Sequence, residues 1–538
     1  MKKIIKFPIL LLIVAFSFTS CEKSFNEVIT SNPNQPTNVP PSLLLNGIEN
    51  SLYVAPYGDA EKWSQYFLIN YDYYGNDRYD FGSGTDYYTT LKNVVQMEAE
   101  AKNLGLPDVN PYSALGKFFR AYFFSLMSLE MGDLPMTEAL QGVANLTPAY
   151  DSQKAIFQQS FTWLEAANTD LAALIVAGDN SLTNDIYFGN DLTKWQKLVN
   201  TFRLRLLIHL SNRAADNADL QVAQQFTSIL GNSSKYPIMT GSSDNLQYNY
   251  LYPTNVYPQN PGNFGFDALR YNCSDTYVGL LTKFNDPRVF VTSEPAAALV
   301  DSLGLPPTSF KVFLGANPGE DLGTMYIKAT SGEYSLINRH HYYDTYTAEP
   351  SIQVGYPEMC FNIAEAINRG WVSGMTASDA ENWYIKGIKE SMKFYGIPET
   401  GNLTVYFLHP GASLGTYDTY SVPVDFNAYY NQVDVKYSGN TTTGLKQILE
   451  QRYLALFRHS GLESYFTYRR TMADPDLKAS GGVPVFQTGP GTGNSGRIAS
   501  RFQYPSSERT ANVSNFKTAL DNQFGGNDDI NALMWIIK

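Results

Sequence analysis

The chain of 538 residues is poor in the side chains that most enzymes use for metal and acid–base chemistry. It has three cysteines and five histidines, and no H-E-x-x-H, C-x-x-C or EF-hand loop occurs in it. Acid–base catalysis would have to rest on carboxylates, which the sequence alone cannot pair. We therefore expect no catalytic residue, no metal and no cofactor.

Positive charge and long apolar runs are also scarce. The formal net charge is −12, which argues against nucleic acid and anionic lipid as main partners because both need a basic face. Beyond the N-terminal leader no segment reaches about 18 uninterrupted apolar residues, the length needed for a membrane-spanning helix. Hydrophobic residues make up 43% of the chain and charged residues 17%, which excludes a disordered protein.

Aromatic residues, in contrast, are abundant, with 38 tyrosines and 31 phenylalanines. The stretch 63–88 is dense in aromatics, and many tyrosines lie beside Asn and Asp in loops without helical period, at 72–88, 249–266 and 338–346. Such a ring can pack on a sugar or a peptide while its polar neighbours hydrogen-bond to the same ligand. The candidate ligand-binding residues are Tyr73, Tyr74, Tyr79, Tyr87, Tyr88, Tyr257, Tyr342 and Tyr343. The alternative is a set of long loops held in place by their own tyrosines.

Residues 1–20 have the pattern of a bacterial lipoprotein signal peptide. Three lysines precede an apolar run of about ten residues, which is too short to span a bilayer as a helix, and small residues then lead to Cys21. We expect cleavage before Cys21 and a lipid on its thiol. Residues 21–41, polar and rich in proline, would then form an extended tether. The alternative is an ordinary secretory signal followed by an incidental cysteine.

The two remaining cysteines, Cys273 and Cys360, leave two interpretations open. A disulfide could form between them in an oxidising compartment, and two buried free thiols fit the sequence at least as well.

Helical periodicity dominates the chain from residue 42 onward, which we expect to form a single domain over 42–538. Apolar residues recur at helical spacing at 42–53, 112–130, 152–176, 192–212, 220–230, 358–369 and 377–394. These segments predict a mostly α fold, a scaffold of tetratricopeptide-like helix pairs, although no clean 34-residue period is present. Loop-rich stretches with short strands are expected at about 233–357, 401–437 and 480–538, where Pro, Gly, Asn and Tyr are frequent.

A helix hairpin is predicted from Leu445 to Thr471, with a break at Ser460-Gly461. Apolar residues follow helical spacing on both sides of the break, which predicts a pair of core helices. Gln447, Glu450 and Arg452 are expected on the opposite, polar face of the first helix. Arg469 and Arg470 fall in the last turn of the second helix, where the helix dipole favours cations.

Three short matches to enzyme motifs do not hold up in context. Ser413 lies in a G-x-S-x-G match after a strand-like run at 403–408, but no helix follows, as a nucleophile elbow requires. Residues 491–496 fit G-x-G-x-x-G without a surrounding βαβ unit. His340 and His341 are adjacent, so on an extended chain they point to opposite faces and cannot share a metal.

A set of motifs spans nearly the whole chain. They are the lipoprotein signal ending at Cys21, NPNQPTNVPPSLLL (32–45), LGKFFRAYFFSLMSLEMGDLPM (115–136), WQKLVNTFRLRLLIHLSNR (195–213), EMCFNIAEAINRGW (358–371), ILEQRYLALFRHSGLESYFTYRRT (448–471), RFQYPSSERTAN (501–512) and GGNDDINALMW (525–535). In sequence and order they resemble the SusD/RagB family of nutrient-binding outer-membrane lipoproteins of Bacteroidetes, in its SusD-like branch.

The resemblance implies a surface-exposed, lipid-anchored protein of the outer membrane that is not an enzyme. It would bind an oligosaccharide or a peptide and deliver it to a SusC-like TonB-dependent β-barrel transporter. Members of the family use different aromatic residues for different ligands, so no binding residue can be carried onto a numbered tyrosine here. The alternatives are a surface glycoside hydrolase, which the long helix pairs argue against, and a purely structural surface lipoprotein.

Overall fold

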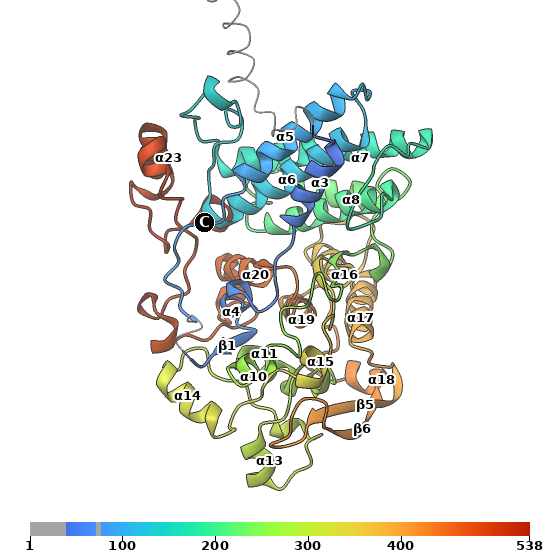
Figure 1. Cartoon of the computed structure of the whole chain (residues 1–538), viewed down its shortest axis with the longest axis vertical. Helices are drawn as coiled ribbons and strands as arrows, with labels where there is room; N and C mark the ends of the chain where they lie inside the picture. Colours follow the sequence, from blue (N-terminus) through green and yellow to red (C-terminus); the bar gives the residue numbers. More distant parts are fainter. Residues whose placement is uncertain (1–38, 72–76) are drawn as a thin grey trace, which may run out of the picture.

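The computed structural model describes residues 39–71 and 77–538. Long helices form the upper part of the molecule, and the lower part carries short helices, loops and small sheets (Figure 1). One continuous hydrophobic core contains residues from Leu45 to Ile537. Among the helices so described, none is long and apolar enough to cross a membrane. The signal peptide, Cys21 and the tether up to residue 38 lie outside the described residues.

The upper scaffold is a layer of helices in which successive members pack against one another. It consists of α3 (Pro41–Asn50), α5 (Tyr88–Asn103), α6 (Pro111–Met131), α7 (Gln153–Ala177), α8 (Leu192–His209) and α9 (Val222–Gly231). A second group, α16 (Tyr356–Asn368), α17 (Ala377–Phe394), α19 (Thr442–Ala455) and α20 (Glu463–Ala473), lies below it and packs on α8 through α16 and α20. The predicted mostly α fold of helix pairs is confirmed; α5 is a helix that the sequence interpretation missed.

Local capping explains where the long helices begin and end. The Asn110 side chain accepts a hydrogen bond from the Ser113 backbone N–H, and the Ser113 hydroxyl accepts one from the Asn110 backbone N–H. These two reciprocal bonds form a capping box at the start of α6. Ser152 is the N-cap of α7, because its side chain accepts a hydrogen bond from the Ala155 backbone N–H, and Gly178 ends the helix in the left-handed conformation that glycine adopts without strain. The helix α6 is buried nearly all round, so it forms the centre of the scaffold.

In the described part of the chain, three two-stranded antiparallel sheets lie outside the scaffold. They are β1 (Phe67–Ile69) with β3 (Tyr271–Cys273), β2 (Leu246–Tyr248) with β4 (Ser351–Val354), and β5 (Thr400–Leu408) with β6 (Tyr417–Asp425). The strand expected at 403–408 is therefore confirmed as part of β5. Its hairpin loop carries Ser413, which is exposed and is followed by a strand rather than a helix.

The loop-rich stretches contain more helix than the sequence interpretation expected. Short helices occur throughout them and in the segment before β1: α4 (Asp59–Trp63), α10 (Phe264–Asp267), α11 (Asp275–Lys283), α12 (Val289–Thr292), α13 (Ala297–Leu303), α14 (Leu322–Thr330), α15 (Arg339–Tyr343), α18 (Phe426–Tyr430), α21 (Pro475–Lys478), α22 (Glu508–Ala511) and α23 (Val513–Phe524). Most of these helices are too short to show a helical period in the sequence, and the Gly and Pro residues around them are typical of loops. His340 and His341 lie on α15, so the expectation of an extended chain there was wrong.

The predicted hairpin forms as α19 and α20, but its polar face is not exposed. Gln447, Glu450 and Arg452 are all buried, with Arg452 at 1% exposure. Other helices cover this face, and Arg452 is paired with buried carboxylates there. Arg470 at the end of α20 likewise pairs with Glu365.

Both Cys273 and Cys360 are buried free thiols in the structure. Burial raises the pKa of Cys273 to about 12, and it also raises the pKa of Cys360 well above its ordinary value. Neither thiol is therefore reactive at neutral pH.

Candidate functional site

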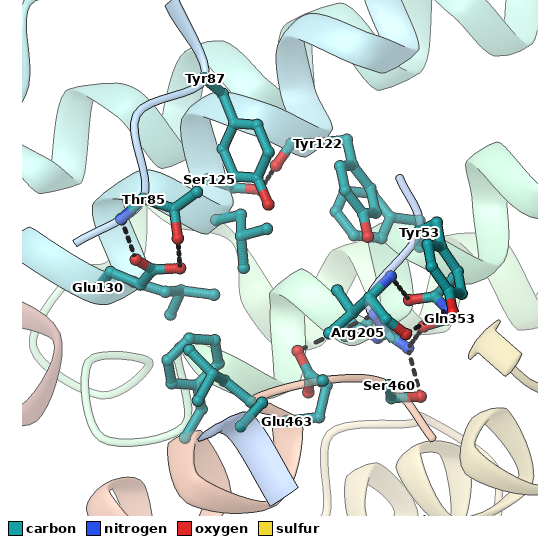
Figure 2. A pocket seen from close by; sticks show the side chains of 18 of the residues that line it. Tyr53, Thr85, Tyr87, Tyr122, Ser125, Glu130, Arg205, Gln353, Ser460 and Glu463 are labelled. Carbon is teal, nitrogen blue, oxygen red and sulfur yellow. Dashed lines mark hydrogen bonds and ion pairs between the residues drawn. The ribbon is translucent and has the colours of Figure 1, made fainter. Parts of the chain in front are cut away.

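A cavity of about 340 Å³ lies between the helical scaffold and two other parts of the chain, the segment around α4 and the start of α20 (Figure 2). Ala55 and Thr85 are exposed residues at its edge, whereas Ser125 and Phe466 deep in its wall are almost completely buried. The cavity is thus a cleft that reaches from the surface into the junction of the two helix groups. Its volume is at the lower end of the range of small-molecule sites.

Aromatic side chains form much of the cavity wall. They come from the 53–63 segment, from the start of α5, and from α6, α8 and α20: Tyr53, Trp63, Tyr87, Tyr122, Phe202 and Phe466. Figure 2 shows Tyr87 and Tyr122 in the upper part of the cavity, with Arg205 and Glu463 below them. The hydroxyls of Tyr87 and Tyr122 make no hydrogen bond to any described residue, so both can bond to a ligand.

Arg205 and Glu463 at the floor of the cavity belong to a buried ionic network that joins four helices. Arg205 on α8 and Arg452 on α19 both bind Glu358 on α16, with Nε–Oε1 and Nη2–Oε1 distances of 2.7 and 3.1 Å. Arg452 also reaches Glu463 on α20 at 3.1 Å, and His209 Nε2 lies 3.1 Å from the other Glu463 oxygen. Burial lowers the pKa of His209, so the imidazole is neutral. Two cations and two anions then cancel.

The upper edge of the cavity is held by Glu130 at the end of α6. Its carboxylate accepts hydrogen bonds from the Thr85 backbone N–H at 2.6 Å and from the Thr85 hydroxyl at 3.2 Å. Thr85 lies two residues before Tyr87, so this contact fixes the entry of the chain into α5. Burial raises the pKa of Glu130 to about 7.

The wild-type protein should lose stability as the pH rises from 4.5 to 7, and the Glu130→Gln substitution should reduce this loss. Burial raises the pKa of Glu130 from 4.5 to about 7. In this window the folded protein keeps a proton that the unfolded chain releases, so stability falls as the pH rises. The melting temperature of the wild type should therefore drop more steeply than that of the variant, measured by thermal unfolding at half-unit pH steps. Parallel curves for the two proteins would contradict this role.

Most of the predicted tyrosines do not lie at the cavity. Tyr73 and Tyr74 lie outside the described residues. Tyr79, Tyr257, Tyr342 and Tyr343 are buried at 0 to 1% exposure, so their rings offer no surface to a ligand in this structure. Tyr87 lines the cavity, and Tyr88 is half-buried next to it in sequence.

Four of these tyrosines make specific contacts that hold their rings in place. The Tyr79 hydroxyl donates to the Trp63 carbonyl at 2.9 Å, which ties its loop to α4. Tyr257 and Tyr342 surround the guanidinium of Arg458, whose Cζ lies 5.6 and 4.4 Å from the two ring centroids. The Tyr88 hydroxyl donates to the Pro135 carbonyl at 2.6 Å. These contacts connect the described parts of the loops to the rest of the chain.

Several cavity residues were not predicted. Tyr122, Phe202 and Phe466 lie in strongly helical segments, where the sequence assigns every ring to the core. Arg205 and Glu463 give a signal that could have been used, because a charged residue on an apolar helical stripe predicts a buried partner. The described residues contain no group of three His, Cys, Asp or Glu side chains that could hold a metal.

The fold and the cavity together define a helical protein with a small, aromatic-walled cleft between two helix groups. Residues 33–505 match the family model SusD-like_2, described as starch-binding associating with outer membrane. The chain therefore belongs to the SusD-like family of outer-membrane-associated, nutrient-binding proteins, whose structures are helical and tetratricopeptide-like.

Solved structures agree with this assignment. A SusD homologue from Bacteroides fragilis is 29% identical, with a TM-score of 0.77 over 93% of this chain and 100% of its own. An outer-membrane protein from Bacteroides vulgatus, described in connection with nutrient binding, is 27% identical with a TM-score of 0.75 and the same coverage. A chitin-binding SusD homologue from Flavobacterium johnsoniae shares the fold at 19% identity and a TM-score of 0.67, over 93% of this chain and 98% of its own. No curated protein matches the chain.

Proposed function

We propose that the protein binds a short, uncharged segment of an oligosaccharide in the cavity between α6, α8 and α20. The observation that carries the proposal is the combination of aromatic walls with a floor whose charges cancel. Rings pack against the C–H groups of a sugar, and the free hydroxyls of Tyr87 and Tyr122 can bond to its hydroxyls. A glycan is favoured over a charged peptide because the floor holds no net charge for an ionic group. Starch and chitin fragments are the natural probes, given the family description and the chitin-binding relative.

Replacing Tyr87 by alanine should weaken glycan binding by on the order of 1–3 kcal/mol, the range for burying a large apolar side chain. Folding should change little, because the ring is only partly buried. Isothermal titration calorimetry with malto- and chito-oligosaccharides measures the effect.

The matched control is Tyr88→Ala, which removes a neighbouring ring that does not line the cavity. Its affinity should equal that of the wild type, although its melting temperature should fall because Tyr88 bonds to Pro135. Equal loss of affinity in both variants, or none in Tyr87→Ala, would place the site elsewhere.

We propose further that residues 42–538 form one binding domain tethered to the outer surface of the outer membrane through lipidated Cys21. The support is the small-residue pattern that leads to Cys21 and the polar tether after it. Cell fractionation of Cys21→Ala should move the protein out of the outer membrane. Membrane retention of this variant would argue against the lipid anchor.

A SusC-like TonB-dependent transporter is the proposed recipient of the ligand, and the protein itself is proposed to catalyse nothing. The proposal of a transporter rests on membership in the family. The proposal that the protein catalyses nothing rests on that membership and on the enzyme motif matches, none of which has the structural context that it needs. A tagged chain purified from outer membranes should bring a β-barrel transporter with it. Release of reducing sugar by the pure protein would contradict the second part.

A further inference from the structure

A second concave site lies near the C-terminus of the chain, which Figure 1 marks. It is a groove of about 630 Å³ formed by the end of α20, the chain around 478–500 and the last residues, 531–538. It shares no lining residue with the cavity.

The charged side chains that line the groove all have the same sign. They are Arg469, Lys478, Arg497 and Lys538, and among the residues that the structure describes no Asp or Glu side chain lines the groove. Lys478 and Arg497 are exposed, and neither forms an ion pair with a residue that the structure describes. In a chain of net charge −12, this is a local reversal of sign.

The deeper cation also lacks a carboxylate. Arg469 is 5% exposed and donates to the carbonyls of Ser500 and Leu129, each at 2.7 Å. The Lys538 carbonyl oxygen accepts a hydrogen bond from Arg213, a residue outside the groove lining, at 2.8 Å. The positive charge of the groove is therefore not neutralised by its own lining side chains.

Aliphatic side chains separate the cations. Val485 and Leu533 are 49% and 48% exposed, and Met472 and Ile498 are partly buried beside them. The two aromatic rings of the groove, Tyr468 and Phe486, stack on each other at 4.3 Å and are largely buried. They provide no open platform for a sugar ring, so the lining suits a ligand with aliphatic side chains and carboxylates.

We propose that this groove binds an extended acidic polypeptide segment of another protein, in which aliphatic residues alternate with Asp or Glu. The carboxylates pair with Lys478 and Arg497 at the rim, and the aliphatic side chains cover Val485 and Leu533. The proposal does not depend on glycan binding in the cavity.

A fluorescein-labelled peptide of alternating Leu and Glu, titrated with the full chain and followed by fluorescence anisotropy, tests the proposal. The same peptide with Gln in place of Glu should bind at least about fivefold more weakly, and salt should weaken only the acidic one. The double variant Lys478→Glu/Arg497→Glu should lose the preference for the acidic peptide, whereas glycan binding stays unchanged.

The matched control replaces Lys92 and Lys102 by Glu. These are two exposed lysines on α5 that line neither site, so the control changes the net charge by the same amount as the groove variant. It should keep the preference for the acidic peptide. Equal binding of the Glu and Gln peptides to the wild type would overturn the proposal, whether or not the variants fold. So would an equal loss in the control, because attraction by overall charge alone would then explain the binding.

Discussion

Glu358→Gln should destabilise the protein by about 3–5 kcal/mol, the usual effect of removing one partner of a buried ion pair. Glu358 is 2% exposed and binds both Arg205 and Arg452. Without its charge, two buried guanidinium groups share only Glu463, and the floor of the cavity gains a net positive charge. Urea unfolding followed by circular dichroism should show the midpoint shift.

Glu399→Gln is the control for this prediction. Glu399 pairs with Lys389 at 2.6 Å, but their side chains are 65% and 36% exposed. Water screens such a pair, so the loss should stay within about 1 kcal/mol. If the two substitutions cost the same, the buried network does not hold the four helices together.

Leu126→Trp should reduce glycan affinity by more than about 100-fold, which corresponds to roughly 2.7 kcal/mol. Leu126 is a partly buried residue of α6 in the cavity wall, so the tryptophan ring, which is larger than the leucine side chain, extends into the open volume. The ligand would then have to displace the new side chain. Stability should fall by less than overpacking usually costs, because space is available for the ring.

Val176→Trp provides the same change on another helix. Val176 is 88% exposed on α7 and lines neither site. Calorimetry should give wild-type affinity for this variant. Wild-type affinity for Leu126→Trp as well would mean that the ligand does not enter the cavity.

The helical scaffold could be predicted from the sequence because its signals are local. Long stretches such as 112–130 and 152–176 repeat apolar residues at helical spacing, and the caps at Asn110 and Ser152 lie where the structure begins the helices. The short helices could not be predicted. A helix of four or five residues such as α15 depends on tertiary packing, which periodicity does not report.

The cavity could be predicted only at one edge. Tyr87 was selected because it belongs to an aromatic loop, but the same reasoning selected Tyr257 and Tyr342, which are buried around Arg458. An aperiodic tyrosine beside polar residues is compatible both with a binding loop and with a loop held by its own ring. Only the long-range contacts decide, and these join segments hundreds of residues apart, as in the bond from Tyr66 to the Tyr453 carbonyl at 2.8 Å.

The charges of the cavity floor illustrate the same limit. From the sequence, Arg452 could be placed only on the face opposite the apolar stripe, because a single helix cannot show what packs against it. Its partners, Glu358 and Glu463, lie on two other helices. The sequence contains the compensating charges but not their pairing, so the neutral floor appears only in the folded chain.

A crystal structure of the protein with a bound malto- or chito-oligosaccharide tests the central claim most directly. Our account predicts a sugar ring in the cavity between Tyr87 and Phe466, with its hydroxyls bonded to Tyr87 or Tyr122. A glycan bound at another surface, with the cavity between α6, α8 and α20 free of sugar, would contradict it.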